Sequence, residues 1–344
     1  MNSFSVIEVN DAKWSKIIHR SYKYDFYHTQ SYNLLETEHR PILCVSYFND
    51  EFIALPLIVR KIPNTSLFDC TSVYGYCGAI SSIDFNDVSN DSVINFTQQL
   101  KDYFKQNNIV TVFSRLHPLI ESENVLNNLG DVHNVNNTVA IDLKISADEQ
   151  RKQYRKSNKS ELNQLRRKGF VVEEAKTEQE VDEFISIYNE TMDRVNASQS
   201  YYFDRDYYLS FLNNKCFQSK LLLAKKEGEV VAGAIFTISD KIMQYHLAGT
   251  KSEFIRETPM KLVLDEARLL ANSLNLEFLH LGGGVGGSDE DSLFRFKSGF
   301  SQLRFNFKVW KYICDEKKYN ELVEAKFSSE VPETNFFPIY RLNN

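Results

Sequence analysis

Hydrophobic and polar positions follow a similar pattern in both halves of the chain. Each half has three short runs rich in β-branched and aromatic residues, which predict strands, and a helical pattern after the third run. The first half places these elements at 42–48, 52–60, 73–81 and 89–106, with a turn at Asn49-Asp50. The second half places them at 220–225, 230–238, 242–248 and from Thr258-Pro259 to about Ser273, with a turn at Glu227-Gly228. The sequence therefore predicts a weak internal repeat of the α/β class, with α+β mixed sheets.

Further elements flank the second copy. An amphipathic helix is expected at 178–195, because apolar residues recur on one face at Val181, Phe184, Ile185, Tyr188, Met192 and Val195. After the second copy we expect a strand at 276–281, a glycine loop at 282–287, a short helix at 289–298 with Ser288 as N-cap, and a strand at 303–314. Residues 1–145 with 316–344 are expected to form one domain, and residues 146–315 the other.

Composition and charge narrow the classes of function. The 344 residues carry 40 Lys and Arg against 46 Asp and Glu, a net charge of −6, and 42% of them are hydrophobic. This length is enough for about two domains with their own cores, and the composition excludes disordered and fibrous chains. A chain that mainly coats nucleic acid or anionic membrane would be basic over its whole surface, so the acidic balance argues against both.

Cysteines, histidines and the N-terminus exclude further classes. Five scattered cysteines without a C-x-x-C pair predict neither a disulfide framework nor a zinc knuckle, and they fit a reducing compartment. The seven histidines form no H-x-x-x-H or H-E-x-x-H pattern, so no metal is expected. The N-terminus does not have the pattern of a signal peptide, and no stretch is apolar enough to cross a bilayer. We therefore expect a soluble, cytoplasmic protein.

The glycine loop from Gly282 to Gly287 formally matches the dinucleotide-binding pattern G-x-G-x-x-G. A Rossmann pyrophosphate rests on the N-terminus of the next helix, but Asp289, Glu290 and Asp291 occupy that position and would repel it. We therefore reject dinucleotide binding. A glycine loop still indicates that the backbone closely approaches a ligand or a neighbouring strand.

A second loop, between the strand 242–248 and the following helix, is a candidate anion site. Thr258 is the expected N-cap and Pro259 the first helical residue, and the free amides at such a helix start can hold a pyrophosphate. The candidate binding residues are Lys251, Arg256, Thr258 and Lys261. A capped helix with a solvated basic loop explains these residues equally well.

One segment is strongly basic. It contains Arg151, Lys152, Arg155, Lys156, Lys159, Arg166, Arg167 and Lys168. These cations can grip a nucleotide phosphate or an RNA backbone, but a solvated helix face is the more common meaning of such a run.

Two side chains suggest reaction chemistry. His246 follows Tyr245 in a strand expected at the sheet centre, where a histidine of near-neutral pKa can take a proton from an attacking amine. A hydrogen-bonded core histidine is the alternative. Cys77 is a possible nucleophile, but no base is identifiable beside it, so a small buried hydrophobic residue is the better interpretation.

Several short motifs follow one another in a characteristic order. They are Asp25 to Thr29, Leu55-Pro56-Leu57, Asp69 to Gly78, Tyr201 to Arg205, Leu281 to Gly284, and Phe296 to Phe300. In this order, and over most of the chain, they resemble the FemX-like proteins, which consist of two domains of the GCN5-related N-acetyltransferase (GNAT) fold.

This resemblance implies acyl transfer to an amine, with donor and acceptor meeting in a cleft between the domains. In the peptidoglycan-bridge members, residues matching Lys297 and Phe296 lie at the acyl donor, and an arginine matching Arg205 helps to bind the acceptor. The pyrophosphate motif Q/R-x-x-G-x-G/A of simple acetyltransferases is absent, although residues 251–261 occupy the corresponding junction of strand and helix.

Two branches of the family are relevant. One uses aminoacyl-tRNA to extend peptidoglycan bridges. The other transfers an acyl group, such as acetyl or 3-hydroxybutanoyl, from acyl-coenzyme A to the amino group of a dTDP-linked amino-deoxysugar for O-antigen and other surface glycans. The acidic charge favours the sugar branch, because an RNA donor is expected to need a broad positive surface. An aminoacyl-tRNA-dependent transferase and a non-catalytic ligand-binding module are the alternatives.

The expected reaction is direct attack of a neutral amine on the thioester, without an acyl-enzyme. His246 is the first candidate base, with Asp69 and His28 in reserve, and Lys297 is expected to stabilise the oxyanion together with a backbone N–H of the His246 strand. The candidates for substrate binding are Tyr27, His28, Ser72, Tyr74, Tyr76, Tyr202, Arg205, Tyr245, Gly283 and Phe296. Acyl-coenzyme A is the expected donor and no metal is required, and nucleic acid and membrane are not the expected partners.

Overall fold

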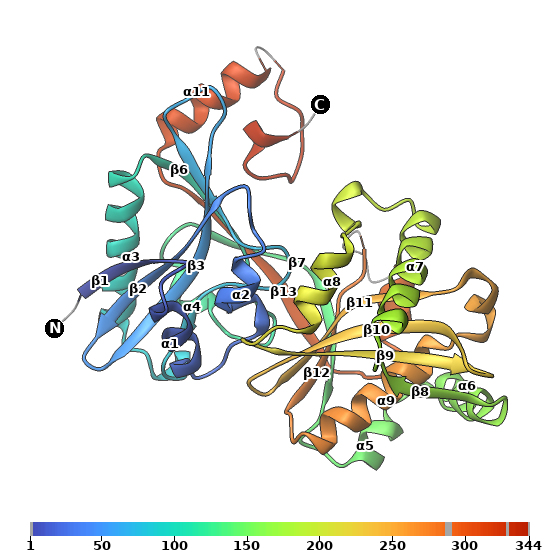
Figure 1. The fold of residues 1–344 in the computed structure, drawn as a ribbon. Helices are drawn as coiled ribbons and strands as arrows, with labels where there is room; N and C mark the ends of the chain where they lie inside the picture. The colour runs from blue at the N-terminus through green and yellow to red at the C-terminus, as the bar shows by residue number, and fades with distance from the viewer. Residues whose placement is uncertain (1–2, 286–290, 328–329, 343–344) are drawn as a thin grey trace. The chain divides into compact units, whose positions relative to one another are not determined.

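The computed structural model describes residues 3–285, 291–327 and 330–342 (Figure 1). The chain divides into two compact units, residues 1–135 with 306–344 and residues 136–305. The sequence placed the boundaries after residues 145 and 315, so both lie ten residues earlier in the structure. The second difference has a clear cause, because residues 309–313 of the strand predicted at 303–314 pair with a strand of the first unit.

The first unit is built on a mixed sheet with the strand order β1-β2-β3-β4-β6-β13. Neighbouring strands are antiparallel except β4 and β6, which are parallel and are connected through helix α3. The strands are β1 (Ser3–Glu8), β2 (Arg40–Phe48), β3 (Glu51–Lys61), β4 (Phe68–Thr71), β5 (Ile80–Ser81), which pairs with β3, β6 (Ile109–Arg115) and β13 (Arg304–Ile313). The helices are α1 (Lys13–Arg20), α2 (Gln30–Asn33), α3 (Asn90–Gln106), α4 (Glu123–Leu126) and α11 (Glu316–Phe327), with 3-10 turns at Phe26–His28, Phe85–Asp87 and Ile339–Arg341.

Local sequence signals explain the first unit well, with one exception. Helix α3 begins after Ser89, whose side chain accepts a hydrogen bond from the Ser92 N–H, and it buries an apolar face that includes Phe96. The single strand predicted at 73–81 is wrong. The structure has β4 before this segment and β5 at its end, because Gly75 and Gly78 have φ angles of 111° and 97°, which an extended strand does not allow.

The second unit repeats this arrangement with the strand order β7-β12-β11-β10-β9-β8. The strands are β7 (Asp131–Asp142), β8 (Phe170–Glu174), β9 (Gln218–Lys226), β10 (Glu229–Ser239), β11 (Ile242–Thr250) and β12 (Phe278–Gly282). The helices are α5 (Ala147–Lys152), α6 (Lys156–Arg167), α7 (Glu178–Arg194), α8 (Arg205–Leu212), α9 (Met260–Ser273) and α10 (Ser292–Lys297), with 3-10 turns at Gln199–Tyr201 and Ser252–Glu257.

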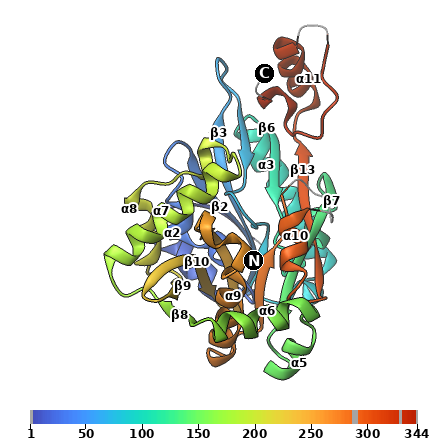
Figure 2. The same ribbon diagram turned by 90° about the vertical axis from the view of Figure 1, so that its right-hand side faces the viewer.

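The two sheets share one topology. In each, an edge strand and two antiparallel strands lead to a parallel pair, β4 with β6 and β11 with β12, and a helix, α3 or α9, connects the two strands of the pair. The mixed α/β class predicted from the sequence is confirmed. Figure 2 shows the second unit from another side, with α6 and α9 next to each other.

Helix ends in the second unit refine the predictions. Helix α7 begins with a capping box between Thr177 and Glu180, and Ile187 joins its buried face, whereas Val195 lies beyond its end and is 60% exposed. Helix α10 has Asp291 as its N-cap, with the side chain accepting from the Phe294 N–H. The predicted N-cap Ser288, with Gly286, Gly287, Asp289 and Glu290 of the predicted loop and helix, lies outside the described residues.

Candidate active site

Strands β11 and β12 separate in the middle of the second sheet. They pair only where Ile242–Gln244 lies opposite Phe278–His280, although both strands continue further. On its other side β11 has a bulge, because His246 is an extra residue between two positions that pair with consecutive residues of β10. The backbone from Tyr245 onward therefore lies past the end of the β11–β12 ladder, at the place where the β10–β11 ladder is also irregular.

Lys297, the last residue of α10, lies at this separation. Its Nζ donates a hydrogen bond to the Gly283 carbonyl, 2.7 Å away, and lies over the Tyr245 ring, 5.6 Å from the ring centroid. The side chain is 7% exposed, and burial lowers the pKa of Lys297 from 10.5 to about 7, with the Asp291 charge acting in the opposite direction. Three residues predicted from the sequence are thus brought together, and the cation among them titrates near neutral pH.

His246 packs against an aromatic stack from α8. Its ring is stacked on Phe211, with centroids 5.0 Å apart and planes 12° apart, and Phe211 in turn stacks on Tyr207. Burial lowers the pKa of His246 to about 3. The sequence predicted a histidine of near-neutral pKa here, and the structure corrects this, because an imidazole with so low a pKa is a poor proton acceptor at neutral pH.

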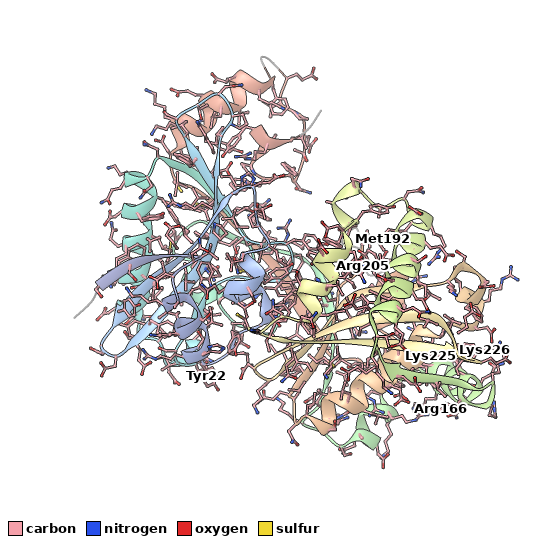
Figure 3. All side chains as sticks on the ribbon, viewed as in Figure 1. Tyr22, Arg166, Met192, Arg205, Lys225 and Lys226 are labelled. Carbon is pink, nitrogen blue, oxygen red and sulfur yellow. The ribbon has the colours of Figure 1, made fainter. Side chains whose placement is uncertain are left out.

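Other predicted residues of the second unit make different contacts. Phe296 packs edge-on against Phe300 in the core, 5.7 Å between centroids, next to Lys297 in the chain. Arg205, labelled at the start of α8 in Figure 3, donates to Asp182 (2.6 Å) and to Glu178 (2.8 Å) of α7. Tyr202 donates its hydroxyl to Asp193 (2.7 Å). Arg205 and Tyr202 thus already have carboxylate partners, which a substrate would have to replace.

The start of α9, predicted to bind a pyrophosphate, is held by a carboxylate of the protein. Glu161 of α6 accepts hydrogen bonds from the Thr258 hydroxyl (3.1 Å) and from the Lys261 ammonium. Thr258 is not the N-cap as predicted. It has a left-handed φ of 56°, and Pro259 takes the N-cap position without a side-chain cap.

The remaining predicted pyrophosphate ligands are also poorly arranged for an anion. Lys251 pairs with Glu229, and Arg256 is exposed at the rim of a pocket of about 120 Å³ that Glu161 and Glu257 also line. Because two carboxylates share this small pocket with the cations, a pyrophosphate does not fit here in the arrangement that the structure shows.

Part of the basic segment is structural. The buried Asp265 of α9 accepts hydrogen bonds from Arg151 (3.2 Å), Arg166 (2.8 Å), Arg268 and the Tyr154 hydroxyl. These bonds fasten α5 and α6 to α9. Lys168 pairs with Glu257 at 3.0 Å. Three of the eight predicted cations therefore neutralise carboxylates of the same unit.

Asp69 in the first unit has a structural role rather than that of a base. It is fully buried, and its carboxylate accepts from Arg60 (2.8 Å), from Arg341 (2.6 Å) and from the Tyr340 hydroxyl (3.1 Å). Both oxygens are therefore engaged, and the residue ties the C-terminal segment to β4.

A buried cluster surrounds Tyr27 and His28. His117, which the sequence did not single out, has an Nδ1 that accepts the Leu119 N–H (3.1 Å), so its Nε2 donates to Asp25 (2.9 Å). Burial lowers the pKa of His117 to about 3 and that of His28 to about 4, so both rings are neutral at neutral pH. His28 is therefore not a suitable reserve base. No local spacing reveals the Asp25–His117 pair, because the two residues are 92 positions apart.

The loop over this cluster carries the other predicted residues of the first unit. Tyr76 lies edge-on to Tyr27, 5.9 Å between centroids, and Ser72 accepts the Arg115 N–H at 3.1 Å. Tyr74 is 60% exposed, with the Arg115 guanidinium 5.7 Å from its ring centroid. Tyr74 is therefore exposed to solvent with the Arg115 guanidinium over its ring. Tyr27 packs against the loop so closely that it would collide with any Cβ on Gly75.

The described part of the chain was also searched for a cysteine nucleophile, a metal site and a membrane-spanning helix. Cys77 is fully buried and its thiol pKa is raised to about 12, which opposes a nucleophilic role. Within residues 3–285, 291–327 and 330–342, no group of His, Cys, Asp and Glu side chains is arranged to hold a metal ion. None of the helices in these ranges is long and apolar enough to cross a membrane.

Comparisons with known proteins concern the fold and the domain family. Residues 150–298 match the family model of an acetyltransferase (GNAT) domain. Among solved structures, FemX has a TM-score of 0.72 at 12% identity, covering 92% of this chain and 99% of FemX. L-PGS from Bacillus licheniformis has a TM-score of 0.57 at 14% identity, covering 90% of this chain and 94% of that chain. The C-terminal domain of a putative lysylphosphatidylglycerol synthetase from Agrobacterium fabrum has a TM-score of 0.57 at 12% identity, covering 89% and 92%. A comparison with curated proteins found no match.

Residues 150–298 of the second unit are therefore similar to a GNAT domain. Domains of this kind are acyltransferases and generally use acyl-coenzyme A. The chain as a whole has the fold of FemX, and at these identities the similarity establishes the fold alone.

Proposed function

We propose that this protein is an N-acyltransferase that moves an acyl group from an activated carrier to a primary amine. The observation that carries the proposal is the position of Lys297, which the Gly283 carbonyl holds where β11 and β12 separate. A buried cation can supply positive charge to a developing oxyanion, and the strand beyond the interrupted ladder can supply backbone N–H groups to it. The match of residues 150–298 to an acetyltransferase domain supports the same class of reaction.

In this reaction the amine attacks the acyl carbonyl directly. A C–N bond forms, the bond from the carbonyl carbon to the carrier breaks, and the leaving group takes the electron pair and the amine proton. The Lys297 ammonium and backbone N–H groups past Gln244 stabilise the negative charge on the carbonyl oxygen. His246 shapes the bulge through its contact with Phe211.

For the donor and acceptor, the first candidates are acyl-coenzyme A and a nucleotide-linked amino sugar. General use of acyl-coenzyme A by GNAT domains supports the donor. In the first unit, the exposed Tyr74 ring with the Arg115 guanidinium over it is the feature that supports such an acceptor, because aromatic and guanidinium planes stack on sugars and bases.

A second candidate donor, aminoacyl-tRNA, is favoured by a specific observation. Glu161 takes the hydrogen bonds of Thr258 and Lys261, and Glu257 lines the same pocket. These carboxylates disfavour the pyrophosphate of coenzyme A at the start of α9, whereas an aminoacyl ester does not bring a pyrophosphate to this place.

One experiment separates these candidates. The protein is mixed with a panel of acyl-coenzyme A donors and dTDP-linked amino sugars, and in parallel with charged tRNA and the same acceptors, and products are read by mass. An acylated amine in either arm supports the proposal and identifies the donor, provided that Lys297→Met abolishes it. Ligands that raise the melting temperature without any turnover would instead indicate a binding module, since a ligand at about 100 times its Kd stabilises by ~2.7 kcal/mol.

The pH dependence tests the role of Lys297 separately. If the ammonium form is required, activity should fall as pH rises through about 7, the pKa of this side chain. In Lys297→Arg the side chain stays charged, so any remaining activity should lose this fall. A rise of wild-type activity across the same range, absent from the arginine variant, would assign Lys297 as a base instead.

A further inference from the structure

A row of polar side chains crosses one face of the second sheet. Its members are opposite one another on four neighbouring strands, and they are Ser219 of β9, Thr237 of β10, Gln244 of β11 and His280 of β12. The residues next to them in the chain, such as Phe236 and Met243, belong to the apolar core that packs on α9. Because side chains alternate along a strand, the polar row lies on the opposite face, the one that α7 covers at Gly233.

The polar row is buried, and its hydrogen bonds are incomplete. Thr237, Gln244 and His280 are each at most 2% exposed. Among the side chains that the structure describes, the hydroxyls of Ser219 and Thr237 have no hydrogen-bond partner. A buried polar group without a partner costs about 1–3 kcal/mol, so apolar side chains of similar shape would make this face more stable. Packing alone therefore does not explain the row, whereas binding of a polar substrate group does.

Hydrogen bonds fix which ring nitrogen of His280 can accept a proton. The Gln244 amide nitrogen donates to the Tyr245 carbonyl (3.1 Å), so the other atom of this amide, its oxygen, is the one near the ring. That oxygen lies 2.6 Å from His280 Nδ1, and because it can only accept, Nδ1 carries the hydrogen. The lone pair of the neutral ring is therefore on Nε2. His280 is thus held by the neighbouring strand in the tautomer that accepts a proton at Nε2.

His280 lies beside the place where β11 and β12 separate. It pairs with Gln244 in the last rung of the ladder, and the next residue of β11 is Tyr245, whose ring centroid is 5.6 Å from the Lys297 ammonium. The Tyr245 ring packs with the core on α9, so Lys297 and His280 lie on opposite faces of the sheet. An acyl carbonyl placed between the separating strands therefore has a cation on one side and a proton acceptor on the other.

We propose that His280 is the general base of the acyl transfer. The inference rests on the proposed function and adds the group that handles the proton. As the amine nitrogen forms its bond to the acyl carbon, it becomes positively charged and gives one hydrogen to Nε2. The bond from that carbon to the carrier then breaks, and the imidazolium returns the proton to the leaving sulfur or oxygen, so the ring ends neutral. Gln244 is a positioning residue, because its amide oxygen holds the Nδ1–H throughout.

The first test compares acyl transfer by wild type and by His280→Asn. The asparagine amide can still donate to Gln244 in place of Nδ1, but it has no basic nitrogen. We expect kcat to fall by ~100-fold or more with KM within about twofold, at an unchanged melting temperature. The same substitution at the exposed His133 should leave all three quantities at their wild-type values.

The outcomes separate this role from the proposed function. Wild-type kcat in His280→Asn would overturn the role of His280 and leave the acyltransferase in place. Wild-type protein without turnover on any donor would overturn the acyltransferase, and the general base with it.

A second test needs no turnover. In protein labelled with nitrogen-15 at histidine, NMR shifts distinguish a ring nitrogen that carries hydrogen from one that carries a lone pair, and His280→Asn identifies the signals of His280. We expect the hydrogen on Nδ1 in wild type. Gln244→Leu should lose this preference and, with it, most of the turnover. A hydrogen on Nε2 in wild type would overturn the proposal, as would full turnover in Gln244→Leu with the Nδ1 preference lost.

Discussion

Replacement of Lys297 by Met should remove activity while making the second unit more stable. In the unfolded chain this lysine has a pKa of 10.5, whereas in the folded protein burial lowers the pKa to about 7. The unfolded chain therefore binds more protons between pH 7 and 10.5, and the difference of about 3.5 pKa units is equivalent to ~4–5 kcal/mol that favours unfolding at neutral pH. Methionine has no charge to desolvate and avoids this penalty.

Part of the gain is lost with the hydrogen bond. The Gly283 carbonyl accepts from Lys297 at 2.7 Å, and leaving a buried acceptor without its donor costs about 1–3 kcal/mol. The net expectation at pH 7 is ~2 kcal/mol of added stability, or a melting temperature higher by ~4–8 °C for a unit of this size. The turnover number should fall by ~100- to 1000-fold, as for the loss of one oxyanion donor.

Urea unfolding of both proteins at pH 7 and at pH 10 measures the effect. As pH rises the unfolded lysine loses its proton, so wild type should approach the stability of Lys297→Met. A lower melting temperature for the variant at pH 7 would contradict this reasoning. So would a difference in unfolding free energy between the two proteins that does not change with pH, because either result would show that burial of the Lys297 charge does not destabilise the fold. Unchanged turnover would remove it from the reaction.

Three other substitutions or conditions test the structure. Asp69→Asn should destabilise the first unit by ~3 kcal/mol in urea, because two arginines that are about one-fifth exposed lose the buried carboxylate that neutralises them. Glu321→Gln at an exposed pair should change stability by less than ~1 kcal/mol, and equal effects of the two substitutions would contradict the network around Asp69. Gly299→Ala should destabilise by ~1–3 kcal/mol, since its Cβ would lie 2.4 Å from Asn158 Nδ2, and adding Asn158→Ala should recover part of the loss; a double variant no better than Gly299→Ala would refute the contact. Acid should destabilise the fold between pH 6.5 and 4, because burial lowers the pKa values of His28, His117 and His246 and the unfolded histidines bind more protons, while Asp25, whose pKa is raised to about 7, acts in the opposite direction; unfolding that starts at the same urea concentration at pH 7 and 4.5 would contradict this.

The sequence predicted the features that depend on local pattern. The hairpins β2–β3 and β9–β10, with their turns at Asn49 and Glu227, follow from alternation and turn chemistry, and both turn residues have positive φ. Lys297 and Gly283 were predicted as separate site residues from the family resemblance, and their contact was not predicted, because the two lie 14 residues apart and no periodicity connects them.

The missed features depend on contacts between distant elements. Glu161 is a lone acid in a basic run and was not singled out from the sequence, because only the packing of α6 on α9 brings it to Thr258 and Lys261. The net charge of −6 is a sum over two units, so it does not give the charge of either unit. Residues 1–135 and 306–344 hold 16 basic and 21 acidic residues, a net charge of −5, which leaves the unit with the GNAT domain close to neutral.

The bonds of Asp69 to Tyr340 and Arg341 also have a consequence for the order of folding during synthesis. The first unit needs β13 and residues near position 341, whereas the second unit is one continuous segment, 136–305. On the ribosome, the part of the chain that emerges first must therefore wait for the last, and the second unit can complete its sheet while the first is still lacking a strand. A stalled or truncated chain would leave the early half with an open sheet edge and the buried Asp69 without its arginine from the C-terminal segment.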